Sequence, residues 1–279
     1  MIPMAEERKD LSRLCIHTMT NRPWSLEECV SHYRRVGIRG ISVWRNLLEE
    51  MDTIRARGIL DDHGMEVVSL VRGGFFASSD AGKRELALED NLLALEQAGA
   101  IGAPILVLVC GADERQSLSR SREQIRESIE KLIPHARESR VKLAVEPLHP
   151  MYAADRSAIN TLSQANDMVE SIHSDQVGVA VDVFHLWWDP DLCREILRCG
   201  NNGNLLAFHI CDWKASMKDM LNDRGLMGEG VINLRQIREW VEEAGFGGFI
   251  EVEIFSEKYW AMDQPVYLDR IIDAYLKYT

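Results

Sequence analysis

The chain has 279 residues, of which 46% are hydrophobic and 27% charged, and its formal net charge is −12. This acidic balance argues against nucleic-acid binding, which needs clustered Lys and Arg to displace counterions. No apolar segment approaches the roughly 18 residues that span a bilayer, so we expect neither a nucleic-acid nor a membrane partner.

The cysteines and the first residues indicate the cellular compartment. The six cysteines form no CxxC pair and no disulfide-dense pattern, which favours reduced thiols. The first 14 residues, MIPMAEERKDLSRL, are charged and lack the apolar core of a signal peptide. We expect a cytoplasmic protein.

Short apolar runs rich in β-forming residues alternate with longer helix-like segments along the whole chain. The first helical segment follows Ser25, with Glu28 at the reciprocal position of a capping box. The predicted strands are Leu14–Thr18, Gly40–Trp44, Glu66–Gly74, Pro104–Gly111, Val141–Pro147, Val177–Asp182, Leu205–Asp212 and Gly248–Phe255. About eight helices fall between and after these strands.

Strict alternation of this kind implies parallel strands joined by right-handed crossovers. Eight such units in 279 residues predict a single (β/α)8 TIM-barrel domain over residues 1–279. A doubly wound open sheet is the alternative, but no GxGxxG motif follows the first strand.

The chemistry of a TIM barrel lies at the carboxyl ends of its strands. The residues at these ends are His17, Trp44, Arg45, Arg72, Cys110, Glu146, Asp182, His185, His209, Asp212, Glu251 and Glu253. Each of the last four strands delivers an acid or a histidine to the same rim. Like charges crowded in a region of low dielectric repel each other, so each one needs a compensating partner.

A divalent cation is the partner that the residue types favour. Glu146, Asp182, His209 and Glu253 combine hard oxygens with one nitrogen, a set that suits Mn²⁺ first, then Mg²⁺ or Co²⁺, with Zn²⁺ as a further option. We choose Glu253 over Glu251 because it lies nearer the strand end on the same face. His185, one helical turn beyond Asp182, is expected to reach a substrate oxygen.

Five motifs carry a resemblance that covers nearly the whole chain: AVEP, VDVFH, FHICD, RGLMGEG and EVEIF. In this order and spacing they resemble the sugar phosphate isomerase/epimerase superfamily. These xylose isomerase-like barrels include ketose 3-epimerases, hydroxypyruvate isomerases, inosose dehydratases and endonuclease IV. The resemblance implies one divalent ion per chain held by the four residues above, and it makes a homodimer or homotetramer plausible.

In the epimerase branch, the glutamates matching Glu146 and Glu253 also act as the acid/base pair on opposite faces of the substrate. The residues matching His185 and Arg224 bind substrate oxygens there. We therefore expect a metal-dependent sugar isomerase or epimerase of carbohydrate metabolism, acting through a metal-stabilised enediolate.

Three other functions stay open. Loss of a β-substituent from the same intermediate would make the protein a lyase or dehydratase of a keto-glycoside or cyclitol. An endonuclease IV-like nuclease would use three zinc ions and extra histidines, where this chain has Arg72 and Cys110. A non-catalytic carbohydrate-binding barrel would keep the metal without exchanging a substrate proton.

Further substrate-binding candidates are Trp44, Arg72, Trp188 and Trp260. The tryptophans are expected either to stack on a sugar or aglycone ring or to pack between barrel and helices. Stacking would favour a substrate larger than a free pentose. Arg72 either contacts substrate or forms a structural ion pair. The long loop WKASMKDMLNDRGLMGEG is a candidate lid. Lys214 at its base is either a proton donor near the site or a solvated lysine.

Overall fold

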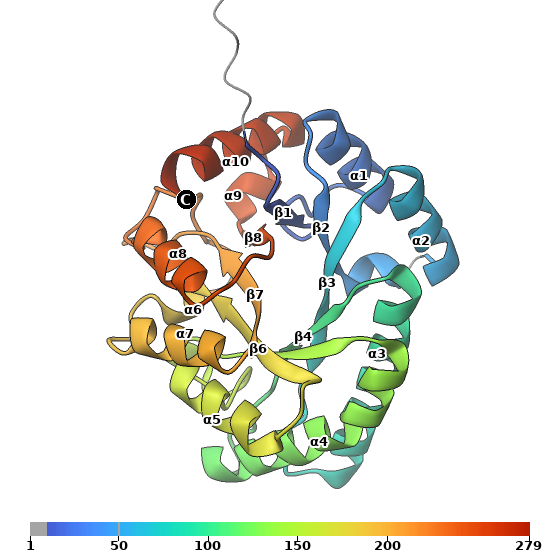
Figure 1. Ribbon diagram of the computed structural model, residues 1–279, viewed down its shortest axis with the longest axis vertical. Helices are drawn as coiled ribbons and strands as arrows, with labels where there is room; N and C mark the ends of the chain where they lie inside the picture. Colours follow the sequence, from blue (N-terminus) through green and yellow to red (C-terminus); the bar gives the residue numbers. More distant parts are fainter. Residues whose placement is uncertain (1–9, 50) are drawn as a thin grey trace, which may run out of the picture.

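The computed structural model describes residues 10–49 and 51–279, and eight parallel strands close into a barrel in the order β1 to β8. Figure 1 shows the helices surrounding these strands. The strands are β1 Leu14–His17, β2 Gly40–Trp44, β3 Glu66–Gly74, β4 Ile105–Val109, β5 Lys142–Glu146, β6 Val177–Asp182, β7 Leu205–Ile210 and β8 Ile250–Val252. The predicted TIM-barrel fold class is confirmed.

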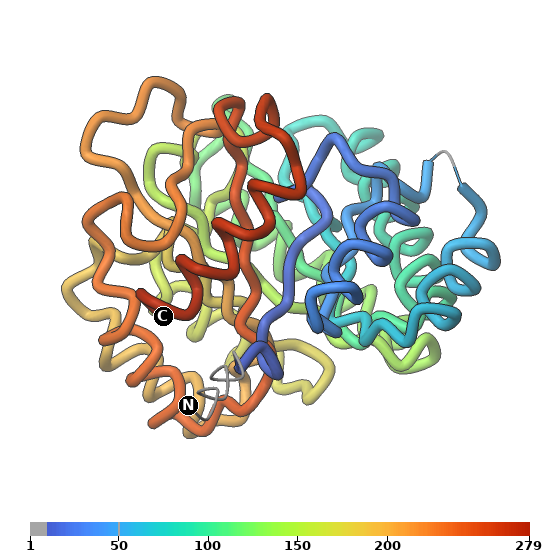
Figure 2. Tube along the Cα trace, turned by 90° about the horizontal axis from the view of Figure 1, so that it is seen from above, coloured from blue at the N-terminus to red at the C-terminus, as the bar shows by residue number. Residues whose placement is uncertain are grey.

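Helices follow the strands in the predicted alternation. The principal helices are α1 Leu26–Arg35, α2 Thr53–Asp62, α3 Ala81–Ile101, α4 Leu118–Ser139, α5 Leu162–Ile172, α7 Leu192–Asn201, α8 Leu234–Glu243 and α10 Gln264–Tyr278. Short helical turns are η1 Arg45–Leu48, η2 Pro150–Tyr152, α6 Val183–Leu186 and α9 Glu257–Trp260. The capping box of Ser25 and Glu28 is present at α1. In Figure 2 the C-terminal segments lie beside the N-terminal strand, where β8 pairs with β1.

The predicted bounds of β2, β3 and β6 are those of the structure, whereas β7 and β8 end earlier than predicted. The chain leaves both ladders to pair with the loop after β7. Asp212 forms a bridge with Gly225, and Asp223 with Ser256. Glu253 thus lies just beyond β8, and its backbone N–H still donates to the carbonyl of Ile210 (3.0 Å).

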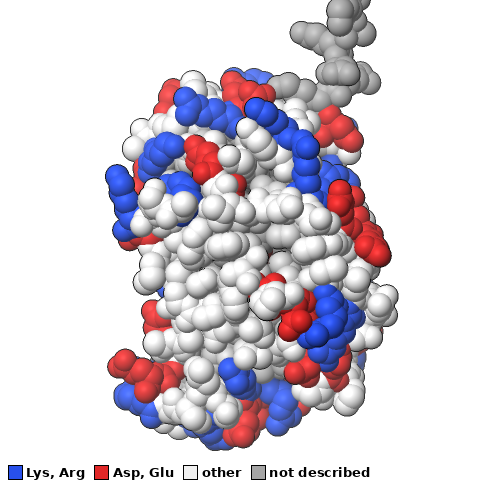
Figure 3. Space-filling model, turned by 90° about the vertical axis from the view of Figure 1, so that its left-hand side faces the viewer, with Lys and Arg blue, Asp and Glu red and all other residues white. Residues whose placement is uncertain are grey.

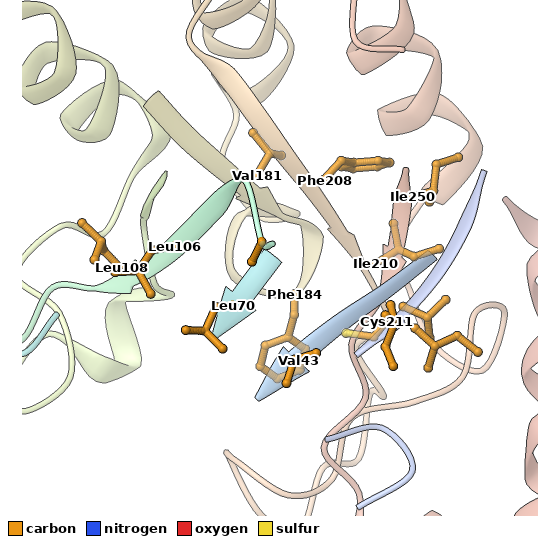
Figure 4. Close-up of a cluster of buried hydrophobic side chains, with 14 of the residues drawn as sticks. Val43, Leu70, Leu106, Leu108, Val181, Phe184, Phe208, Ile210, Cys211 and Ile250 are labelled. Atoms are coloured by element: carbon orange, nitrogen blue, oxygen red, sulfur yellow. The ribbon is translucent and has the colours of Figure 1, made fainter. Parts of the chain in front are cut away.

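Two apolar layers hold the barrel together. The larger cluster includes the strand residues Leu70, Phe208, Ile210 and Ile250, together with Phe184 after β6 (Figure 4). A second cluster has small inner side chains: Val71, Val107, Ala144, Ala180 and Ala207. Small residues inside a barrel leave room for larger side chains in the next layer towards the rim.

Other features of the chain bear on the expected compartment and partners. None of the helices in the described residues is long and apolar enough to cross a membrane. All six cysteines are free, and five are buried. On the face in Figure 3, acidic and basic side chains are interspersed around a band without charged side chains. Residues 1–9, part of the segment that we expect to lack a signal peptide, lie outside the described residues.

Replacing two glycines by alanine should change stability in opposite directions. Gly74 ends β3 with φ +110°, and a Cβ there would lie 2.0 Å from the Val109 carbonyl oxygen. Gly74→Ala should therefore lower the free energy of unfolding by about 2 kcal/mol or more. Gly58, exposed within α2, has no atom within 4 Å of an added Cβ, so Gly58→Ala should raise stability by up to about 1 kcal/mol. Urea unfolding checks both, and a stable Gly74→Ala would contradict the strain at this position.

Candidate metal centre and substrate cavity

Strand alternation places four chemically active side chains on the inside of the barrel. Glu146, Asp182 and His209 each lie two residues after an inner alanine, Ala144, Ala180 and Ala207 respectively. Because side chains on a strand alternate between faces, each active residue shares the face of its alanine. The small alanines lie below, and the polar groups meet at the carboxyl rim.

We call Glu146, Asp182, His209 and Glu253 the strand-end quartet. All four are buried, and each offers a ligand atom such that these atoms lie within 4.8 Å of one another. His209 Nδ1 is 3.0 Å from Glu146 Oε1. Asp182 Oδ1 accepts a hydrogen bond from the Phe184 backbone N–H (2.8 Å), which leaves Oδ2 directed to other partners.

Arg224, from the loop after β7, inserts its guanidinium among the acids. Its Nη1 donates to Asp182 Oδ2 (3.1 Å) and Glu253 Oε2 (2.8 Å). Its Nη2 is 3.3 Å from His185 Nε2. Burial and the adjacent Arg224 charge hold the pKa of His185 well below its usual range, so this imidazole is neutral and accepts the hydrogen bond.

A fourth acid, Glu251, lies beneath the quartet. Its Oε2 accepts hydrogen bonds from Ser42 Oγ (2.5 Å), Ser69 Oγ (3.2 Å) and His17 Nε2 (3.1 Å). The other ring nitrogen of His17 is 3.1 Å from Glu253 Oε1. His17 therefore links the two glutamates, and Glu251 has a fixed place among side chains from β1, β2 and β3.

Burial and crowding perturb the protonation of the quartet. Burial raises the pKa of Asp182 to about 7, although the Arg224 charge opposes the shift. Burial by itself lowers the pKa of His209, but the carboxylates of Glu251 and Glu146 outweigh it and raise this pKa to about 10. For Glu253, burial raises the pKa, and the charges of His17 and Arg224 reverse that shift, so the net pKa is lowered.

The quartet fits a divalent cation. Three carboxylates and one imidazole are the donor types that hard and borderline divalent ions take. His209 Nε2 is buried without a hydrogen bond and lies 3.7 Å from Glu251 Oε2, so one ring nitrogen of this histidine has no partner among the described residues. Within the described residues the other group of potential ligands, His17, His209 and Glu253, shares two members with the quartet, so the two groups form one centre.

A cavity of about 210 Å³ opens beside this centre. It is lined by Trp44, Val71, Arg72, Val109, Glu146, Leu148, Tyr152, Arg156, His185, Leu221, Arg224, Glu253 and Phe255. The candidates Trp44, Arg72, His185 and Arg224 thus meet Glu146 and Glu253 in one space. Trp188 and Trp260 are not among the lining side chains, because their indole N–H groups donate to the carbonyls of His185 (2.8 Å) and Met19 (2.9 Å).

The loop after β7 covers one side of the cavity and is held by Asp212. The Asp212 carboxylate accepts hydrogen bonds from the backbone N–H groups of Trp213, Gly228, Gly230 and Ile232. Met227 is buried, Met217 is half-buried and Met220 is exposed. Lys214 pairs with Asp223 within the loop rather than lining the cavity.

Sequence reasoning missed Tyr152, Arg156 and Phe255, which also line the cavity. The Tyr152 hydroxyl donates to the Met220 carbonyl, which joins the loop after β5 to the loop after β7. The signal available in the sequence was the length of the β5–α5 connection, residues 147–161. Long loops on the carboxyl face of a barrel usually build its site.

Comparisons with protein families, with curated proteins and with solved structures all point to the same family. The family described as "Xylose isomerase-like TIM barrel" matches residues 30–275. An inosose isomerase of Halalkalibacterium halodurans is 25% identical over 264 residues, 90% of each chain. The structure of protein SMc04130 from Sinorhizobium meliloti 1021 has a TM-score of 0.93 at 42% identity, covering 96% of this chain and 99% of that one. The IOLI protein with a bound zinc atom has a TM-score of 0.83 at 20% identity, covering 96% and 99%.

The quartet predicts metal content that depends on its members. Protein purified without chelator and supplied with Mn²⁺ should hold about one divalent ion per chain. Asp182→Asn and His209→Ala should lose it, since each removes a ligand, while Asp61→Asn on the outer face of α2 should retain it. Elemental analysis, with circular dichroism to check folding, measures this. Equal metal content in all four folded proteins would contradict the site.

The metal-free protein should lose stability as pH rises from 7 to about 8.5. A histidine with a raised pKa stabilises the fold fully below its unfolded pKa of about 6.5 and loses that contribution towards its folded pKa, about 10 for His209. We expect a loss on the order of 1–2 kcal/mol in this window, with metal affinity rising over it, because the ion displaces the proton.

Urea unfolding and metal titration at several pH values measure this dependence. His209→Gln should remove most of the slope, and His135→Gln on exposed α4 should leave it unchanged. A stability that is flat or rising from pH 7 to 8.5 in wild-type protein would overturn the assigned protonation of His209.

Proposed function

This chain belongs to the xylose isomerase-like TIM barrel family, and from that premise we propose that it is a metal-dependent isomerase or epimerase of a keto sugar or inosose. The observation that carries the proposal is the placement of two buried carboxylates, Glu146 and Glu253, on the wall of the cavity and within the candidate metal centre. A site of this kind suits removal and return of a proton next to a carbonyl.

The strand-end quartet would hold one divalent ion, which we propose to be Mn²⁺, with Mg²⁺, Co²⁺ or Zn²⁺ as alternatives. Such an ion, when bound, supplies a Lewis acid that polarises the substrate carbonyl and stabilises the charge left by proton removal. Zinc is the ion named for the IOLI protein of similar fold.

Glu146 and Glu253 divide the proton transfer in this proposal. Glu146 Oε1 faces His209, whereas no described residue donates a hydrogen bond to its Oε2. Glu253 has a lowered pKa and is ionised at neutral pH, which is the protonation state that a general base needs. One carboxylate takes the proton from the carbon next to the carbonyl. Its return to the opposite face by the other gives an epimer, and its return to the adjacent carbon gives an isomer.

His185 and Arg224 would position the substrate oxygens, since both line the cavity and both offer polar atoms next to the quartet. Trp44 and Phe255, 5.1 Å apart between ring centroids, form an apolar wall suited to the C–H face of a sugar. The cavity of about 210 Å³ is smaller than the roughly 300–1,000 Å³ typical of sites for drug-sized ligands, which favours a single ring.

The relatives support this reaction type over the alternatives. The inosose isomerase of Halalkalibacterium halodurans matches across nine-tenths of both chains, so the likeness is not confined to one part of the barrel. Endonuclease activity is disfavoured, because the described residues provide one metal centre. A lyase or dehydratase would use the same groups, and its product distinguishes it. The homo-oligomer and the cytoplasmic location stay predictions.

Solvent deuterium uptake tests the function. Mn²⁺-loaded protein incubated in D₂O with a panel of ketohexoses and inososes should label the carbon next to the carbonyl of one of them and convert it. Glu146→Gln and Glu253→Gln should each lower net conversion by about 100-fold or more, because one partner of the acid/base pair is gone. Proton exchange from one epimer should persist in each variant that keeps its metal.

Glu239→Gln on exposed α8 is the control with the same chemical change and should convert substrate at the wild-type rate. Mass spectrometry and NMR identify the products. A product that has lost water would show that the protein is a lyase or dehydratase and not an isomerase. A folded, metal-loaded wild type that labels none of the panel would overturn the proposed reaction.

A further inference from the structure

Two arginines of the cavity pair with no acidic side chain of the described residues. Arg72, at the end of β3, and Arg156, in the loop after β5, both line the cavity and are half-buried. Within residues 10–49 and 51–279, neither guanidinium lies within 4.0 Å of a carboxylate oxygen, and neither donates a hydrogen bond. The structural ion pair considered for Arg72 from the sequence is therefore not formed with these residues.

The nearby acidic side chains form ion pairs with other arginines. Arg45, directly beside β3, takes both oxygens of Asp90 (2.9 and 2.8 Å). Arg224 takes Asp182 and Glu253. Burial and then the nearby Arg156 charge lower the pKa of Arg72, although the carboxylates of Asp90 and Glu146, neither within ion-pair distance, oppose this shift. Both guanidinium groups thus line one cavity, and no carboxylate of the described residues pairs with either of them directly.

Aromatic rings hold both guanidinium groups in place. The Arg72 guanidinium lies over the Phe75 ring at 4.3 Å, and that of Arg156 lies 5.7 Å from the Tyr152 ring centroid. Planar guanidinium groups stacked in this way leave their N–H edges free for a ligand, and those edges match carboxylate or phosphate oxygens in pairs.

The carboxylates of the candidate metal centre form no ion pair with Arg72 or Arg156. The three carboxylates of the quartet are balanced by Arg224 together with a divalent ion, so that centre is neutral when loaded. The positive charge of Arg72 and Arg156 then stands alone on another part of the same cavity wall. A half-buried pair of like charges is costly unless an opposite charge joins it.

We propose that the substrate is an anionic sugar, whose carboxylate or phosphate group binds between Arg72 and Arg156 while its carbonyl end faces the strand-end quartet. This inference rests on the proposed function and narrows it to a substrate class. The cavity volume of about 210 Å³ suits one monosaccharide or cyclitol unit that carries such a group. This anionic monosaccharide or cyclitol replaces the larger, neutral glycoside expected from the tryptophans, because Trp188 and Trp260 do not line this space.

Three ligands that differ only at carbon 6 test the inference: D-fructose, D-fructuronate and D-fructose 6-phosphate. Calorimetric binding is measured with metal-free and Mn²⁺-loaded protein. Wild type should bind at least one anionic ligand about 10-fold or more tighter than D-fructose. Arg72→Met and Arg156→Met should each weaken that binding by about 10- to 100-fold, and change D-fructose binding by less than about 3-fold, because each removes a charged hydrogen-bonding partner.

Arg126→Met, on the outer face of α4, removes the same charge far from the cavity and should bind as wild type. Arg72→Lys should recover only part of the affinity, since it keeps the charge and loses the planar fork. The tighter of the two anions identifies the group as carboxylate or phosphate.

Equal affinity for all three ligands in wild type would overturn the inference, as would an equal loss for neutral and anionic ligands in both methionine variants. Binding to the metal-free protein is measured without turnover, so the two proposals fail separately. Anion-selective binding without deuterium uptake would contradict only the proposed isomerase reaction. Deuterium uptake by neutral sugars without anion selectivity would contradict only the proposed substrate class.

Discussion

Four buried carboxylates at one end of the barrel are the constraint on which the rest of the site depends. Glu146, Asp182, Glu251 and Glu253 are almost fully buried, so water screens their charges weakly. An unpaired buried charge costs several kcal/mol, so each acid needs a partner in a definite place. Two histidines, two serines and one arginine provide these partners in the protein. The ligand atoms of the strand-end quartet would hold a cation that balances the remaining negative charge.

This requirement explains the form of the surrounding chain. The inner alanines of β5, β6 and β7 keep the layer below small, so that larger polar groups fit above it. The long loop after β7 carries Arg224 to the acids, and Asp212 organises that loop through its backbone N–H groups. The loop also supplies Leu221 to the cavity wall. Charge compensation and cavity shape therefore come from the same segment.

The cavity has two kinds of polar surface. Next to the quartet, acids and His185 are suited to hold oxygens and move a proton. On the wall formed by β3 and the loop after β5, Arg72 and Arg156 present positive charge that no acid of residues 10–49 or 51–279 pairs with directly. A protein with a net charge of −12 repels anions at long range, so selection of an anionic sugar would depend on this local pair at short range.

The sequence by itself determined the barrel, the positions of its eight strands and the strand-end residues that meet at one rim. Alternation along a strand is a local property of the backbone, so the preference for Glu253 over Glu251 in the quartet followed from spacing alone. Only the tertiary structure decided the remaining contacts. The Glu251–His17–Ser42 network, the lack of an ion pair between Arg72 and any described residue, the presence of Arg156 in the cavity and the exclusion of Trp188 and Trp260 all depend on residues far apart in the chain. Their distances are set by barrel closure and loop conformation, which no local repeat encodes.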